Sequence, residues 1–128
     1  MDAMAKSGIR HQLRELRTKA WEAELGEALL PIADLFDAWR RGEASAFDLT
    51  EAIHRFHQGE SREIWKKHQS RDTEMLLAQA LADGHLRREQ IPDPVYEVLE
   101  PYVAQLAMLR AAGESTARSP EVEDEETS

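Results

Sequence analysis

The segment Met75–Ala82 places apolar side chains on nearly every side of a helix. It stands between Asp72, a residue suited to an N-terminal cap, and Gly84, a residue suited to a left-handed stop. A helix without a polar side has to be surrounded by other elements. Leu86 follows the stop and is placed to pack back onto the helix. We therefore expect a buried central helix here, enclosed by further helices.

Apolar residues at spacings of three and four mark an amphipathic helix that begins at Ile9. Its apolar positions drift to a second face from Trp21 onward, which is typical of a helix held between two neighbours. Pro31 marks either a kink or the first turn of a new helix. Gly42 ends the segment after two arginines, which suit a helix C-terminus.

The C-terminal part of the chain predicts one more long apolar stripe. Asp93 followed by Pro94 is a strong helix start, because aspartate caps and proline suits the first helical position. Pro101 predicts a kink or a division of this helix, and Gly113 predicts its end. The stripe consists of Val95, Val98, Leu99, Tyr102, Val103, Leu106 and Leu109.

Together these patterns predict an all-α fold: a compact bundle of five to six helices, most of them shorter than about 15 residues. Residues 9–113 are expected to form a single helical domain. Residues 1–8 are expected to be a flexible N-terminus. Residues 114–128 contain almost no apolar side chains and many acids, so we expect a disordered acidic tail.

The net charge of −9 is distributed unevenly along the chain. Residues 1–19 carry five Lys or Arg against two acids, or +3, whereas residues 20–113 carry −7 and residues 114–128 carry −5. Phosphate contacts need Lys and Arg, so this acidic body argues against nucleic acid as the main partner. Weak nucleic-acid binding through the basic N-terminal helix stays open as a third hypothesis.

The chain contains no cysteine, which excludes disulfides and zinc–thiolate sites and fits a cytoplasmic location. No segment is apolar enough to suggest a membrane span, so no membrane partner is expected. Glycine-rich phosphate loops and nucleophile elbows are absent. These absences lean against an enzyme, and no cofactor is expected.

The stretch between Phe47 and His68 is the most distinctive part of the chain. We expect two short helices there, capped by Ser45 or Asp48 and separated by a left-handed turn at Gly59. Histidine and carboxylate side chains within it are weak candidates for metal ligands or for a His-dependent enzyme site. These candidates are His54, His57, His68 and Glu51.

The same stretch carries side chains that commonly anchor protein interfaces, namely tryptophan and arginine beside histidine. The leading hypothesis is therefore a non-enzymatic protein-interaction, adaptor or regulatory module that binds a protein partner or a second copy of itself. Self-association would also explain the two apolar faces of the first helix. The candidate residues for binding a partner or ligand are His54, His57, Ser61, Arg62, Trp65 and His68.

Overall fold

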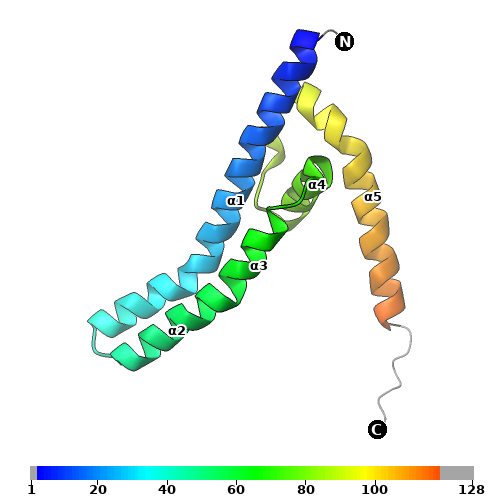
Figure 1. Ribbon diagram of the computed structural model, residues 1–128. Coiled ribbons are helices and arrows are strands. Elements are labelled where there is room, and N and C mark those ends of the chain that lie inside the picture. Colours follow the sequence, from blue (N-terminus) through cyan, green and yellow to red (C-terminus); the bar gives the residue numbers. More distant parts are fainter. Residues whose placement is uncertain (1–2, 119–128) are drawn as a thin grey trace.

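The computed structural model of the chain describes residues 3–118, and side chains are described for residues 7–114. All regular structure in the described range is helical (Figure 1), which confirms the all-α class. No helix within that range combines the length and the apolar character that crossing a bilayer requires. Residues 119–128 of the predicted acidic tail lie outside the described residues, as do residues 1–2.

The first helix, α1, extends from Ala3 to Arg40, so it begins before the expected start at Ile9. It also continues through Pro31, although a proline removes one backbone hydrogen bond and disfavours a helix interior. Both halves of α1 pack against other helices, and this packing outweighs the local cost of the proline. The second half leans away from the direction of the first (Figure 1).

The last helix, α5, extends from Asp93 to Arg118 and follows a short 3-10 turn, η1, at Arg88–Gln90. Pro101 lies inside α5 and does not divide it. The predicted stop at Gly113 is wrong, since the helix continues into the segment 114–128. A glycine in a helix costs only about 1 kcal/mol relative to alanine, so it does not by itself end a helix.

Helix α4, Thr73–Asp83, lies between α1 and α5, as the apolar segment predicts. Asp72 caps it by accepting a hydrogen bond from the Met75 N–H at 3.2 Å. Gly84 ends it with a φ of 84°, which confirms the predicted left-handed stop. Because α4 has a neighbour on two sides, it buries residues at successive positions: Leu76, Leu77, Ala78 and Ala80.

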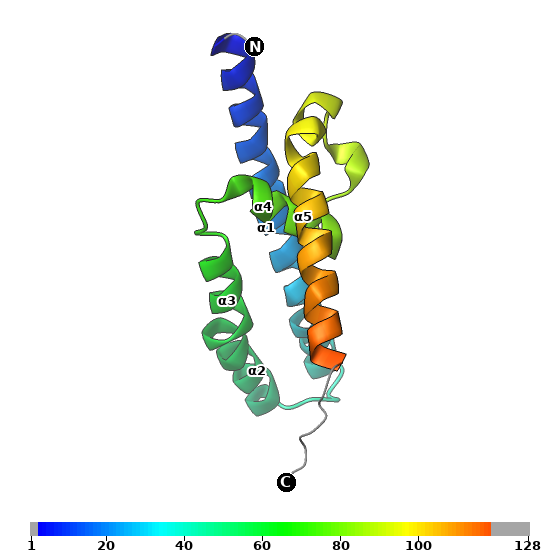
Figure 2. The ribbon, with the colours of Figure 1, turned by 90° about the vertical axis from the view of Figure 1, so that its right-hand side faces the viewer.

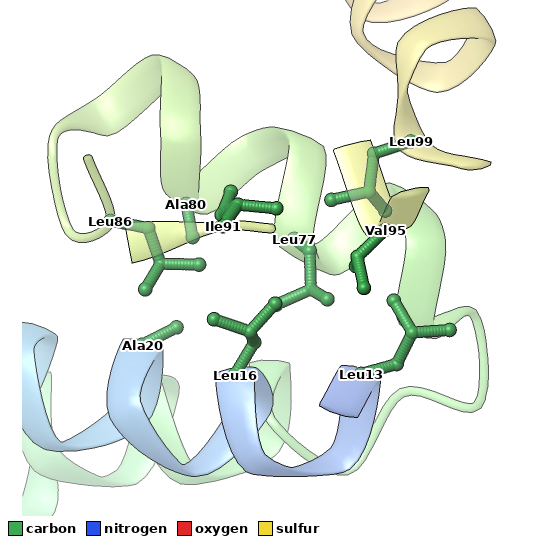
Figure 3. Packing of buried hydrophobic residues seen from close by; sticks show 9 residues of the cluster. All are labelled: Leu13, Leu16, Ala20, Leu77, Ala80, Leu86, Ile91, Val95 and Leu99. Atoms are coloured by element: carbon green, nitrogen blue, oxygen red, sulfur yellow. The ribbon is translucent and has the colours of Figure 1, made fainter. Parts of the chain in front are cut away.

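The largest cluster of buried apolar side chains joins the first half of α1 to α4, α5 and the turn between them (Figure 3). Leu77 points from α4 into the middle of this cluster. Leu86 is also buried there, which confirms its predicted packing. The cluster consists of Leu13, Leu16, Ala20, Leu77, Ala80, Leu86, Ile91, Val95 and Leu99.

Two shorter helices, α2 at Ala46–Gln58 and α3 at Glu60–Lys67, run back alongside the second half of α1 (Figures 1 and 2). We call this assembly of α2, α3 and the second half of α1 (residues 22–40) the hairpin arm. The predicted compact bundle of short helices is therefore only partly matched. With 38 and 26 residues, α1 and α5 are long, because their prolines do not divide them.

Candidate functional site

The distinctive stretch forms α2 and α3, joined at Gly59. Ser45 caps α2: its side chain accepts from the Asp48 N–H at 2.9 Å, and Asp48 accepts from the Ser45 N–H at 3.2 Å. This is the reciprocal capping box, with Asp48 as the second partner and not the cap itself. The predicted left-handed turn at Gly59 is wrong, because its φ is −106°.

Glycine is required at position 59 for space. A Cβ atom there would lie 2.9 Å from the carbonyl oxygen of Arg55, closer than such contacts come in proteins. That oxygen accepts the Gly59 N–H at 2.8 Å, so it is fixed by the end of α2. The absence of a side chain therefore lets α3 follow α2 directly, which sets the position of every candidate residue on α3.

We expect Gly59→Ala to destabilise the protein by about 1–2 kcal/mol, because the new methyl group overpacks the junction. Gly26→Ala is the matched control. Gly26 lies inside α1 with open space around a Cβ, so alanine should stabilise by about 0.5–1 kcal/mol. Urea denaturation measures both values. Equal effects of the two substitutions would contradict the assigned role of Gly59.

The structure does not bring the weak metal candidates together. His54, His57 and Glu51 lie on the exposed surface of α2, and Glu51 accepts a hydrogen bond from Arg55 at 3.2 Å. His68 is buried at the far end of α3. Among the described residues, no group of three or more histidine, aspartate or glutamate side chains is arranged to hold a metal ion.

Four of the six predicted partner-binding residues do meet. A surface pocket of about 590 Å³ opens over the α2–α3 junction, and we call it the junction pocket. The junction pocket is lined by His57, Gln58, Ser61, Arg62 and Trp65. Among these residues, Trp65 is 55% exposed. His54 and His68 are not part of it, so the predicted patch is only partly assembled in space.

His68 belongs to a second, buried arrangement that ties α3 to α1. Its Nε2 lies 2.8 Å from Oε1 of Glu24, and Nζ of Lys67 lies 2.6 Å from Oε2 of the same carboxylate. The His68 side chain is only 3% exposed and that of Glu24 only 14%. One glutamate of α1 therefore binds two consecutive residues at the end of α3.

The carboxylate of Glu24 is held in its charged form. Burial raises the pKa of Glu24, but hydrogen bonds from Lys67 and His68 outweigh burial and set its pKa below the ordinary value of 4.5. A charged carboxylate only accepts hydrogen bonds, so Nε2 of His68 carries the proton in this contact. When the imidazole is neutral, its Nδ1 is consequently an acceptor.

Two further residues of α1, Trp21 and Arg17, contact His68. The ring of Trp21 stacks on its imidazole, with ring centroids 5.2 Å apart and planes within 2°. Arg17 donates to the backbone carbonyl of His68 at 2.8 Å and to Oγ1 of Thr73 at 2.9 Å. Sequence reasoning missed this arrangement. Its only signal was the spacing of Arg17, Trp21 and Glu24, which share one side of a helix.

His85, in the turn that follows α4, makes a second contact with a glutamate of α1. Its side chain is 13% exposed, and its Nε2 lies 2.8 Å from Oε1 of Glu27. The two His–Glu contacts lie a few residues apart on α1, and they fix α3 and the α4–η1 turn to the same helix.

The fold defines this chain as a small all-α domain with a hairpin arm. Comparison with family models, with curated proteins and with solved structures found no match. A function for this chain is therefore inferred from its own surfaces and contacts.

Proposed function

We propose that the protein is a non-enzymatic protein-interaction module and that its hairpin arm is the surface that binds the partner. The observation that carries this proposal is the junction pocket, which combines an exposed tryptophan, an arginine and a histidine. Tryptophan and arginine are the side chains that most often supply the binding energy of protein interfaces.

The arm also exposes most of the large apolar side chains that stay accessible in the described part of the chain. Phe47 at the start of α2 is 87% exposed. Contiguous apolar patches are unusual on monomeric proteins and mark interaction sites, so the concentration of these side chains on the arm favours this part of the molecule. On the arm, the exposed large apolar residues are Leu29, Leu30, Trp39, Phe47, Ile53 and Trp65.

The packing of the arm supports the same proposal. Helices α2 and α3 pack mainly on each other and on α1, whereas α4 and α5 form the main core with the first half of α1. The arm is therefore a thin layer whose outer faces can be covered by a partner. A complementary partner surface would offer an apolar side chain to Trp65 and a carboxylate to Arg62.

Site-specific photo-cross-linking tests the proposal. A photoreactive phenylalanine analogue placed at Gln58, an exposed residue that lines the junction pocket and leaves Arg62 and Trp65 intact, is expected to give a discrete adduct in a cell lysate. The same analogue placed at Glu97, which is exposed on α5, serves as the position control. The mass of the adduct distinguishes a second copy of this chain from a different protein.

Competition makes the test specific for the proposed surface. Excess wild-type protein should remove the Gln58 adduct, whereas a variant with Arg62→Ala and Trp65→Ala should compete at least about 30-fold less well. Thermal melts should show that the variant stays folded, because both side chains are exposed. Equal competition by the two proteins, or equal adducts at both positions, would overturn the proposal.

A further inference from the structure

A separate cavity of about 600 Å³ lies between α1 and the start of α4, and we call it the α1–α4 cavity. Its volume falls within the range of small-ligand sites. It lies next to the buried His68 arrangement and shares none of its residues with the junction pocket. The lining residues that bear on the choice of ligand include Arg10, Arg14, Arg17, Trp21, His68 and Thr73.

Two nitrogen atoms on residues that line this cavity are buried without a hydrogen-bond partner among the described residues: Nε1 of Trp21 and Nδ1 of His68. Leaving such a group unsatisfied typically costs about 1–3 kcal/mol, so buried polar atoms are nearly always paired. The indole N–H only donates, and the imidazole Nδ1 accepts while the ring is neutral. A ligand that satisfies both must offer an acceptor and a donor.

The charged side chains that line the α1–α4 cavity favour an anionic ligand. Arg10, Arg14 and Arg17 follow one side of α1, and Glu74 is the acid among the lining residues. Arg17 is already fixed by Thr73 and by the His68 carbonyl, so its guanidinium is preorganised. Since Asp72 caps α4 and Glu74 follows, the positive charge comes from the arginines of α1 and not from the end of α4.

We propose that the α1–α4 cavity binds a phosphate group, either as the free ion or as a monoester on a small molecule. A singly protonated phosphate offers both functions that the buried atoms lack. Both nitrogens are closed to solvent in the structure, so we infer that the Trp21 ring shifts as the ligand enters. The P–O–H of the hydrogen phosphate ion, or of a singly protonated monoester, then donates to Nδ1 of His68. The other oxygens accept from the indole N–H of Trp21 and from the arginines. A carboxylate ion has only acceptors and leaves Nδ1 of neutral His68 unpaired.

Proton–nitrogen NMR tests the proposal, because the chain has three tryptophans whose indole N–H groups report separately. Inorganic phosphate is titrated into the purified 128-residue protein at constant ionic strength, with chloride as the balancing ion. The Trp21 signal, assigned with Trp21→Phe, is expected to shift and saturate. The signals of Trp39 and Trp65, which are exposed on the arm, are internal controls and should stay in place.

Charge-matched variants separate binding in the cavity from general attraction to arginine. Arg14→Gln should weaken phosphate binding at least about tenfold, by loss of a charged hydrogen bond. Lys19→Gln removes the same charge from an exposed position outside the cavity and should leave the affinity unchanged. An unsaturated Trp21 shift, equal shifts of all three indoles, or equal losses in the two variants would overturn the proposal.

Two other titrants define the ligand. Acetate at the same ionic strength should give no saturating shift, and saturation by acetate would overturn the preference for phosphate. Phosphoserine that binds more tightly than inorganic phosphate would identify a monoester as the ligand, whereas the reverse order would identify the free ion. The photo-cross-linking result at Gln58 is independent of all of these outcomes.

Discussion

Replacement of Leu77 by alanine is expected to destabilise the protein by about 3 kcal/mol, which is a large part of the stability of a small domain. Leu77 is fully buried, and its side chain lies among residues of α1, α4 and α5. Truncation removes apolar contacts with all three helices at once and leaves a cavity. These helices are held by the rest of the same cluster, so the cavity cannot close freely.

Urea denaturation followed by circular dichroism measures this loss, and Leu109→Ala is the matched control. Leu109 is 56% exposed on α5, so the same substitution there should change the free energy of unfolding by less than about 0.5 kcal/mol. The pair also tests the fold against the sequence pattern, in which both leucines are core residues. Comparable losses in the two variants would contradict the difference in burial between Leu77 and Leu109.

The exposure of Leu109 marks a limit to what residue spacing predicts about burial in this fold. Periodicity correctly placed Val95, Leu99 and Leu106 on one buried face. It could not show how far the neighbouring helix extends. Helix α4 ends at Asp83, and the later turns of α5 therefore lack a partner over part of their apolar stripe. Burial depends on that partner, which the spacing of residues within α5 does not encode.

The prolines show a second limit. Pro31 and Pro101 each left a choice between one kinked helix and two separate helices. A local rule gives the cost of a proline but not the packing that offsets it. In contrast, the left-handed stop at Gly84 was predictable, because a glycine after an apolar helix with Leu86 beyond it forms a local motif.

The two candidate sites also differ in how far the sequence could predict them. His57, Ser61, Arg62 and Trp65 lie within nine consecutive positions on two short helices, so their meeting followed from local geometry. The His68 arrangement did not, because Glu24 and His68 are 44 positions apart. Only the packing of α3 against α1 joins them. The same packing explains why His68 separates from the histidines with which it was grouped.

The two proposed sites therefore lie along one helix. Helix α3 carries Arg62 and Trp65 beside the junction pocket, and His68 follows it at the edge of the α1–α4 cavity. The contacts of Glu24 with Lys67 and His68 fix the end of α3 on α1. Together with Arg17, Glu24 thus helps to fix the position of both sites, which makes its replacement informative.

We expect Glu24→Gln to destabilise the protein by about 2 kcal/mol at pH 7. A glutamine can still accept a hydrogen bond from His68 with its oxygen. Its NH₂ group then faces the ammonium of Lys67, so a charge-assisted hydrogen bond becomes a contact between two donors. Glu51→Gln is the control. Glu51 pairs with Arg55 on the exposed surface of α2, so this substitution should change the free energy of unfolding by less than about 0.5 kcal/mol.

The pH dependence of this loss identifies the carboxylate as its cause. Because folding lowers the pKa of Glu24 below 4.5, ionised Glu24 stabilises the folded state above that pH. This contribution is lost as the pH falls through the lowered pKa, when the carboxyl group becomes neutral like an amide. Urea denaturation between pH 7 and pH 3 should therefore show a constant difference between wild type and Glu24→Gln near neutrality. The difference should narrow below pH 4.5, and one that persisted unchanged to pH 3 would show that packing, not charge, holds α3 on α1.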